Sequence, residues 1–195
     1  MLGLKLPTDP RWVNIVESNI SEILIDHAWC EQKAATNAIT LVINNPENAE
    51  IVTKMLALAK EELEHFERVH QIILQRGITM TAERKDSYVN ELVKFMKSRS
   101  DGSRQMGLVD RLLFAALIEA RSCERFKVLS ENIKDEELAP FYRELMESEA
   151  GHYTLFLGLA KKYNGGIDVD KRWKEWLDYE AQVIQNYGKG ETVHG

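Results

Sequence analysis

The chain has 195 residues, 44% of them hydrophobic and 29% charged, so it can bury one sizeable core and we expect a single domain over residues 1–195. No stretch approaches the ~20 apolar residues that span a bilayer, and the N-terminus lacks the basic and apolar segments of a signal peptide. We therefore expect a cytoplasmic protein without a membrane partner. A formal charge of -6 and a pI near 5.5 exclude a basic footprint over the whole domain, so binding to a polyanion would need a local patch.

Apolar residues recur at helical spacing through most of the chain, and the alternation typical of β-strands is missing. After a short N-terminal arm, Met1–Pro10, the pattern predicts four long helices. A crossover between Gly77 and Gly107 follows the second, and Ser87 is expected to cap a short helix within it. Asp168 or Asp170 should open a final helix. The four long helices are expected near Val13–Asn44, Glu47–Arg76, Leu108–Glu131 and Pro140–Tyr163.

Two turn signals divide the four long helices into two hairpins. Asn44-Asn45-Pro46-Glu47 is the first, because the residue before a proline is pushed out of the helical region. Asn132-Ile133-Lys134-Asp135 is the second, with Pro140 suited to the first turn of the following helix. Tyr187–Gly195 is expected to be frayed. The result is an all-α four-helix bundle with one long crossover and an additional C-terminal helix.

Each predicted hairpin carries a glutamate on its first helix and a Glu-x-x-His motif on its second. The turn signals lie midway between the paired glutamates, so an antiparallel hairpin places both glutamates at one height. The Glu-x-x-His pairs fall on apolar stripes with alternating steps of three and four residues, which is the inward seam of a bundle helix. The six residues are Glu31, Glu62 and His65 in the first hairpin and Glu119, Glu149 and His152 in the second.

Four ionised carboxylates inside one bundle would repel one another strongly, and each costs several kcal/mol unless it is paired or metal-bound. Two divalent ions would neutralise the four charges, with two neutral imidazoles completing the site. Mixed oxygen and nitrogen ligands suit iron or manganese, and the absence of cysteine from the pattern argues against structural zinc or an iron-sulfur cluster. We predict a carboxylate-bridged site for two iron ions in a ferritin-like bundle, with a purely structural role of the six residues as the alternative.

Other polar residues near the motifs have simpler interpretations. Glu67-x-x-His70 repeats the pattern but lies well around the helix from the seam, so it should face solvent. Cys30 and Cys123 are expected to be buried thiols rather than a disulfide. We expect solvated helix faces at Glu61, Glu64, Glu124, Glu144 and Glu147.

Three further residues stand close to predicted ligands along the chain. His27, one helical turn before Glu31, is either a structural histidine or a hydrogen-bond partner of that ligand. Lys33 and Arg121 each follow a ligand glutamate by two residues, so their side chains should turn away from the metals. No catalytic residue is assigned beyond the metal ligands, and no flavin or nicotinamide fingerprint is found.

Four local sequences go beyond what a generic di-iron site requires. They are Leu24–His27 leading to Cys30–Ala35, Leu58–Glu67, Ile118–Phe126, and Phe141–Tyr142 through Ser148–His152. These sequences resemble the bacterial tRNA hydroxylase family MiaE, which acts on 2-methylthio-N6-isopentenyladenosine. Gly151 departs from the family, which more often has arginine between the last glutamate and histidine.

The resemblance implies an O2-dependent di-iron monooxygenase that hydroxylates the isopentenyl group of this adenosine in tRNA. Its partners would be tRNA, O2 as co-substrate, and an external electron donor, either a reductase or a ferredoxin. Another ferritin-like di-iron oxidase or peroxidase, or a non-catalytic iron-binding bundle, remains the alternative, and a monomer and a dimer are both open. Candidate basic patches are Arg84, Lys85, Lys94, Lys97, Arg99 and Arg104 in the crossover, and Lys161, Lys162, Lys171, Arg172 and Lys174 near the last helix.

Overall fold

The computed structural model describes residues 2–98 and 102–187, which contain α-helices and no strand. The prediction of an all-α chain is therefore confirmed for these residues. None of their helices combines the length and the apolar character needed to cross a membrane. The helices are α1 (Trp12–Ser18), α2 (Ile20–Asn44), α3 (Ala49–Gln75), α4 (Ser87–Ser98), α5 (Arg104–Asn132), α6 (Leu138–Lys162) and α7 (Val169–Tyr187).

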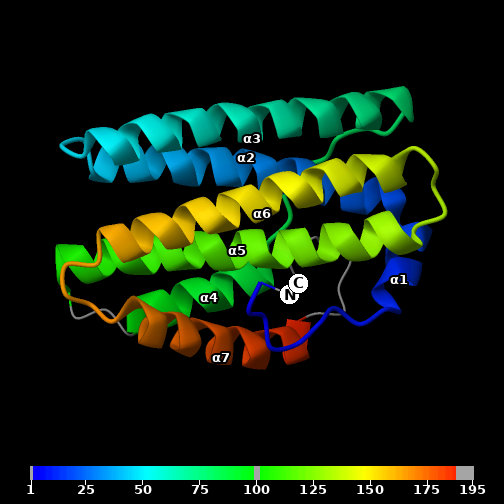
Figure 1. Ribbon diagram of the computed structural model, residues 1–195. Helices are drawn as coiled ribbons and strands as arrows, with labels where there is room; N and C mark the ends of the chain where they lie inside the picture. Colours follow the sequence, from blue (N-terminus) through cyan, green and yellow to red (C-terminus); the bar gives the residue numbers. More distant parts are fainter. Residues whose placement is uncertain (1, 99–101, 188–195) are drawn as a thin grey trace. The chain divides into compact units, whose positions relative to one another are not determined.

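The chain divides into two compact units, and the smaller one runs from Ser18 to Lys85. It consists of α2 and α3, which lie side by side as an antiparallel hairpin (Figure 1). The predicted turn is confirmed, although α3 begins two residues later than expected. Asn48 is the reason, because its side chain accepts a hydrogen bond from the Ile51 amide and so caps the helix.

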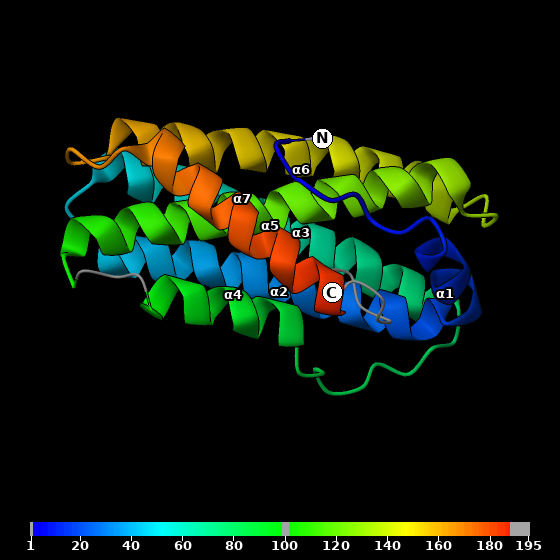
Figure 2. The same ribbon diagram turned by 90° about the horizontal axis from the view of Figure 1, so that it is seen from below.

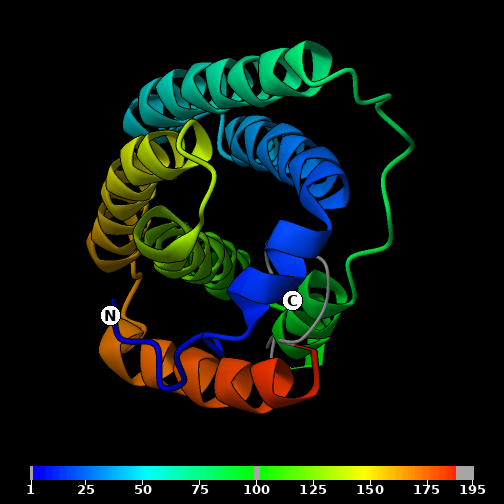
Figure 3. The same ribbon diagram turned by 90° about the vertical axis from the view of Figure 1, so that its right-hand side faces the viewer.

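The larger unit combines the N-terminal arm and α1 with the chain from Asp86 through α7. Its α5 and α6 form the second predicted hairpin (Figure 3), and α4 and α7 pack on each other and against α5 (Figure 2). The α5 helix begins before the expected Leu108, because the Ser103 hydroxyl accepts a hydrogen bond from the Met106 amide. Gly107 therefore lies within α5 rather than at the end of the crossover.

Two other boundaries differ from the sequence predictions. The first long helix is broken at Asn19, whose φ of -138° and ψ of 36° are not helical, so α1 and α2 are separate helices. Asparagine favours such breaks because its side chain competes for backbone hydrogen bonds. The cap of α4 is Asp86, which accepts from the Val89 amide, rather than the expected Ser87. At α7, Asp168 caps the helix, and the residues after Tyr187 lie outside the described chain.

A buried ion network joins α7 and the N-terminal arm to α5 in the larger unit. Arg121, which has no exposed surface, donates to Oε1 of Glu180 at 2.6 and 3.0 Å and to Oε2 of Glu124 at 3.0 Å. The arm joins this network through the Leu6 carbonyl, which accepts from Arg121, and through the Thr8 amide, which donates to Glu124. The expectation of a solvated Glu124 is thus wrong, whereas Arg121 does turn toward a helix interface.

Candidate metal centre

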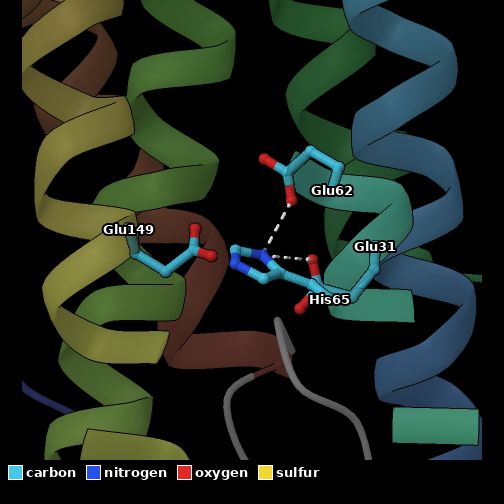
Figure 4. Close-up of side chains that lie close together, drawn as sticks. All are labelled: Glu31, Glu62, His65 and Glu149. Atoms are coloured by element: carbon cyan, nitrogen blue, oxygen red, sulfur yellow. Dashed lines mark ion pairs between the residues drawn. The ribbon is translucent and has the colours of Figure 1, made fainter. Parts of the chain in front are cut away.

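In the α2–α3 hairpin, Glu31, Glu62 and His65 point toward one another (Figure 4). Nδ1 of His65 lies 3.4 Å from Oε2 of Glu62 and 3.8 Å from Oε2 of Glu31. One ligand atom from each residue falls within 4.8 Å of the others, and all three residues are buried. Two carboxylates and one imidazole therefore converge within this unit alone.

The charges of this cluster favour a cation. Burial lowers the pKa of His65, but hydrogen bonds and charge interactions with Glu31 and Glu62 outweigh this effect and raise the pKa to about 10. Burial raises the pKa of Glu31, yet its bonds with His27 and His65 hold it well below its usual range. A divalent ion bound by the same donors would take the place of the imidazole proton.

His27 makes a short contact to one of the predicted ligands. Its Nε2 lies 2.6 Å from Oε1 of Glu31, one helical turn further along α2, and the imidazole is fully buried. Of the two readings offered by the sequence, hydrogen bonding to a ligand is the one observed.

In the α5–α6 hairpin, Glu119, Glu149 and His152 are all buried. Nδ1 of His152 lies 3.9 Å from Oε2 of Glu149, and one oxygen of Glu119 is within 4.8 Å of one ring nitrogen of His152. As at His65, the imidazole presents Nδ1 to the glutamate of its own motif. The second hairpin thus repeats the donor set of the first.

Ser148 is a contact of the second hairpin that the sequence analysis did not single out. Its hydroxyl lies 3.4 Å from Nε2 of His152, on the ring nitrogen away from Glu149. The signal was present in the spacing, because Ser148 stands four residues before His152 on the same helix face.

The helical stripes explain why these polar residues are buried. On α6 the stripe that carries the ligands is buried throughout, at Tyr142, Leu145, Glu149, His152, Phe156 and Leu159, and on α3 the corresponding stripe is buried from Met55 to Val69. Continuing the steps of three and four would bury Ile72, but the buried residue is Ile73. The stripe shifts because 3.6 residues per turn do not match a seven-residue repeat. Glu61, Glu64, Glu67, Glu144 and Glu147, which were expected to face solvent, are exposed.

Two further groups of residues have definite positions in the structure. Cys30 and Cys123 are buried free thiols, as predicted, and burial followed by the charges of Glu124 and Glu119 raises the pKa of Cys123 to about 11. Arg172, expected in a basic patch, is instead buried, with its guanidinium on the Asp110 carboxylate at 2.7 and 2.9 Å.

The whole described chain resembles known proteins. A solved structure described as protein 43 with aldehyde deformylating oxygenase activity from Synechococcus is 30% identical, with a TM-score of 0.89 over 98% of this chain and 95% of that one. This likeness confirms the prediction of a ferritin-like, all-α fold.

Two curated proteins share the name tRNA 2-(methylsulfanyl)-N(6)-isopentenyladenosine(37) hydroxylase. The protein from Pseudomonas putida is 36% identical over 183 residues, which cover 94% of this chain and 87% of that protein. The protein from Salmonella typhimurium is 27% identical, over 93% of this chain and 83% of that protein. Residues 2–195 match the model of the family tRNA-(MS[2]IO[6]A)-hydroxylase (MiaE), and the chain therefore belongs to that family.

Proposed function

We propose that this protein hydroxylates the isopentenyl group of 2-methylthio-N6-isopentenyladenosine in tRNA. The observation that carries the proposal is the family match over residues 2–195, together with a relative of that activity at 36% identity over 94% of the chain. The protein is an enzyme of tRNA modification. Its proposed reaction adds one oxygen atom to a carbon of the isopentenyl group.

We further propose that the two hairpins together hold a pair of iron ions. The donor set fits iron, because each hairpin supplies two buried carboxylates and one imidazole that presents Nδ1 to a carboxylate oxygen. The oxygenase activity of the Synechococcus protein supports a site of this class. The proposed ligands are Glu31, Glu62, His65, Glu119, Glu149 and His152.

The iron pair would supply the electrons and the binding site that O2 needs for reaction with an allylic C–H bond of the isopentenyl group. Converting a C–H bond and O2 into C–OH and water consumes two electrons and two protons, so an external donor such as a reductase or ferredoxin must restore the ferrous state. The protein's own contribution is to hold the ligands in place and to exclude water, and the burial of all six side chains serves both purposes.

A second candidate is the activity of the structural neighbour. At 30% identity over 98% of the chain, the Synechococcus protein favours an oxygenase acting on an aldehyde as the alternative. An iron-storage bundle is the third candidate, and it needs a closed multi-subunit shell. A size measurement that finds a monomer or a dimer would remove it.

The deciding experiment supplies the reduced, iron-loaded protein with O2 and tRNA that carries the isopentenylated base. Nucleoside mass spectrometry should show the modified adenosine heavier by one oxygen atom, and tRNA without the isopentenyl group is the control. Turnover of an aliphatic aldehyde without any change in the tRNA would overturn the proposal and favour the alternative. Because tRNA is the proposed substrate, we place the protein in the cytoplasm.

A further inference from the structure

We propose that His27 is a positioning residue, which holds Glu31 with a single oxygen directed at the metal and thereby makes the two iron positions unequal. The inference rests on the proposed di-iron site. It goes beyond that site because it assigns a role to a residue that is not a ligand, and because it predicts a difference between two positions that the repeated motif would make alike.

The two oxygens of Glu31 have different surroundings. Oε1 lies 2.6 Å from Nε2 of His27, whereas Oε2 lies 3.8 Å from Nδ1 of His65. Oε2 is therefore the oxygen on the side of the other donor atoms, and Oε1 is occupied by the histidine. A bond of this length to an ionised carboxylate is among the stronger hydrogen bonds of proteins.

The arrangement of His27 is well suited to fix this carboxylate. The imidazole stands one helical turn before Glu31 on α2, so the helix backbone sets the spacing of the two side chains. Its ring has no exposed surface, so surrounding atoms limit the rotamers it can adopt. With Oε1 hydrogen-bonded to His27, Oε2 is the oxygen that Glu31 offers more readily to a metal.

Within the part of the chain that the structure describes, the second hairpin has no histidine at the equivalent position. Four residues before Glu119, at the position equivalent to His27, stands Ala115, whose methyl group cannot form a hydrogen bond. One outer contact in this hairpin is made to the imidazole, from Ser148 to Nε2 of His152. The two hairpins thus carry the same types of ligand but differ in the side chains that hydrogen-bond those ligands. Two bound ions would therefore differ in affinity and in spectroscopic environment.

The test replaces His27 with two amides of different reach. Glutamine places its amide nitrogen close to the position of the histidine Nε2, whereas asparagine places it close to Nδ1 and cannot reach Glu31. We expect His27→Asn to weaken the binding of one of the two Fe2+ ions by about 10- to 100-fold in anaerobic competition titrations, and His27→Gln to restore most of the loss. Mössbauer spectra of the 57Fe-loaded protein should show two ferrous environments, of which His27→Asn alters one.

The matched control is His70→Asn, because His70 is in the same unit but stacks on Phe66 rather than contacting a ligand. Circular dichroism checks that each variant is folded. If His27→Asn is unfolded while His27→Gln is folded and binds iron normally, the result still supports a role for the hydrogen bond from residue 27 to Glu31. Wild-type affinities and spectra in folded His27→Asn would overturn the inference. A wild-type protein that takes up no iron would instead overturn the proposed metal site.

Discussion

Glu180→Gln should destabilise the protein by about 3 kcal/mol. Glu180 and Arg121 are both fully buried, and Oε1 of Glu180 accepts two hydrogen bonds from Arg121 and one from the Tyr88 hydroxyl. Removing one partner of a buried pair costs roughly 3–5 kcal/mol, and the lower end applies because the glutamine oxygen still accepts and Glu124 still pairs with the arginine. For a chain of this size, the corresponding fall in Tm is about 6–12 °C.

Urea unfolding followed by circular dichroism measures the change, with thermal unfolding as a second readout. Glu131→Gln on α5 is the matched control, because it removes the same charge. The Glu131 side chain is half exposed, and its carboxylate lies 3.8 Å from the Lys127 ammonium. Its effect should stay below about 1 kcal/mol, as for other surface pairs. If Glu180→Gln were no more destabilising than Glu131→Gln, the buried network would not hold α7 to α5 as we infer.

Three further predictions concern the metal, the thiols and tRNA. Glu149→Ala should lower the iron content of the purified protein and abolish hydroxylation, whereas the exposed Glu147→Ala should change neither, as elemental analysis and nucleoside mass spectrometry would show. Cys123 should resist iodoacetamide at pH 8, because its pKa of about 11 leaves roughly one thiol in a thousand ionised, and its alkylation rate should rise with pH or on unfolding. The affinity for tRNA should fall steeply as the salt concentration rises, and an interaction that is insensitive to salt would contradict this prediction. Neutralising the exposed Lys85 should weaken tRNA binding while the iron content stays unchanged.

The features predicted well from the sequence are those that depend on local geometry. The spacing of Glu31, Glu62 and His65 around the turn at Asn45 requires only that two neighbouring helices fold back on each other, and the structure brings these side chains together. Burial of the seam follows from helical periodicity in the same way. The family resemblance was confirmed by the match over residues 2–195.

Apart from helix ends set by local caps, the features predicted wrongly are charged residues whose partners are distant in the sequence. Glu124 was predicted to be solvated, but it is buried and accepts a hydrogen bond from the Thr8 amide, 116 residues away. Arg172 was likewise predicted to belong to a basic patch, but it is buried and donates a hydrogen bond to Asp110, 62 residues earlier. A charged residue is read as exposed because burial is costly, and that rule fails wherever the chain supplies a buried counter-charge.

Each hairpin assembles two buried carboxylates and one buried imidazole from its own two helices. In the α2–α3 hairpin the charge of Glu31 is partly balanced without metal, since the pKa of His65 is raised to about 10 and its Nδ1 lies 3.8 Å from Oε2 of Glu31. In the α5–α6 hairpin the imidazole of His152 lies near Glu149 at 3.9 Å, a weaker contact. The contacts of His27 and His65 with Glu31 in the first half are therefore shorter than the contact between His152 and Glu149 in the second. Stepwise loading of the wild-type protein with Fe2+ should accordingly give two resolved events, and two identical ones would count against unequal half-sites.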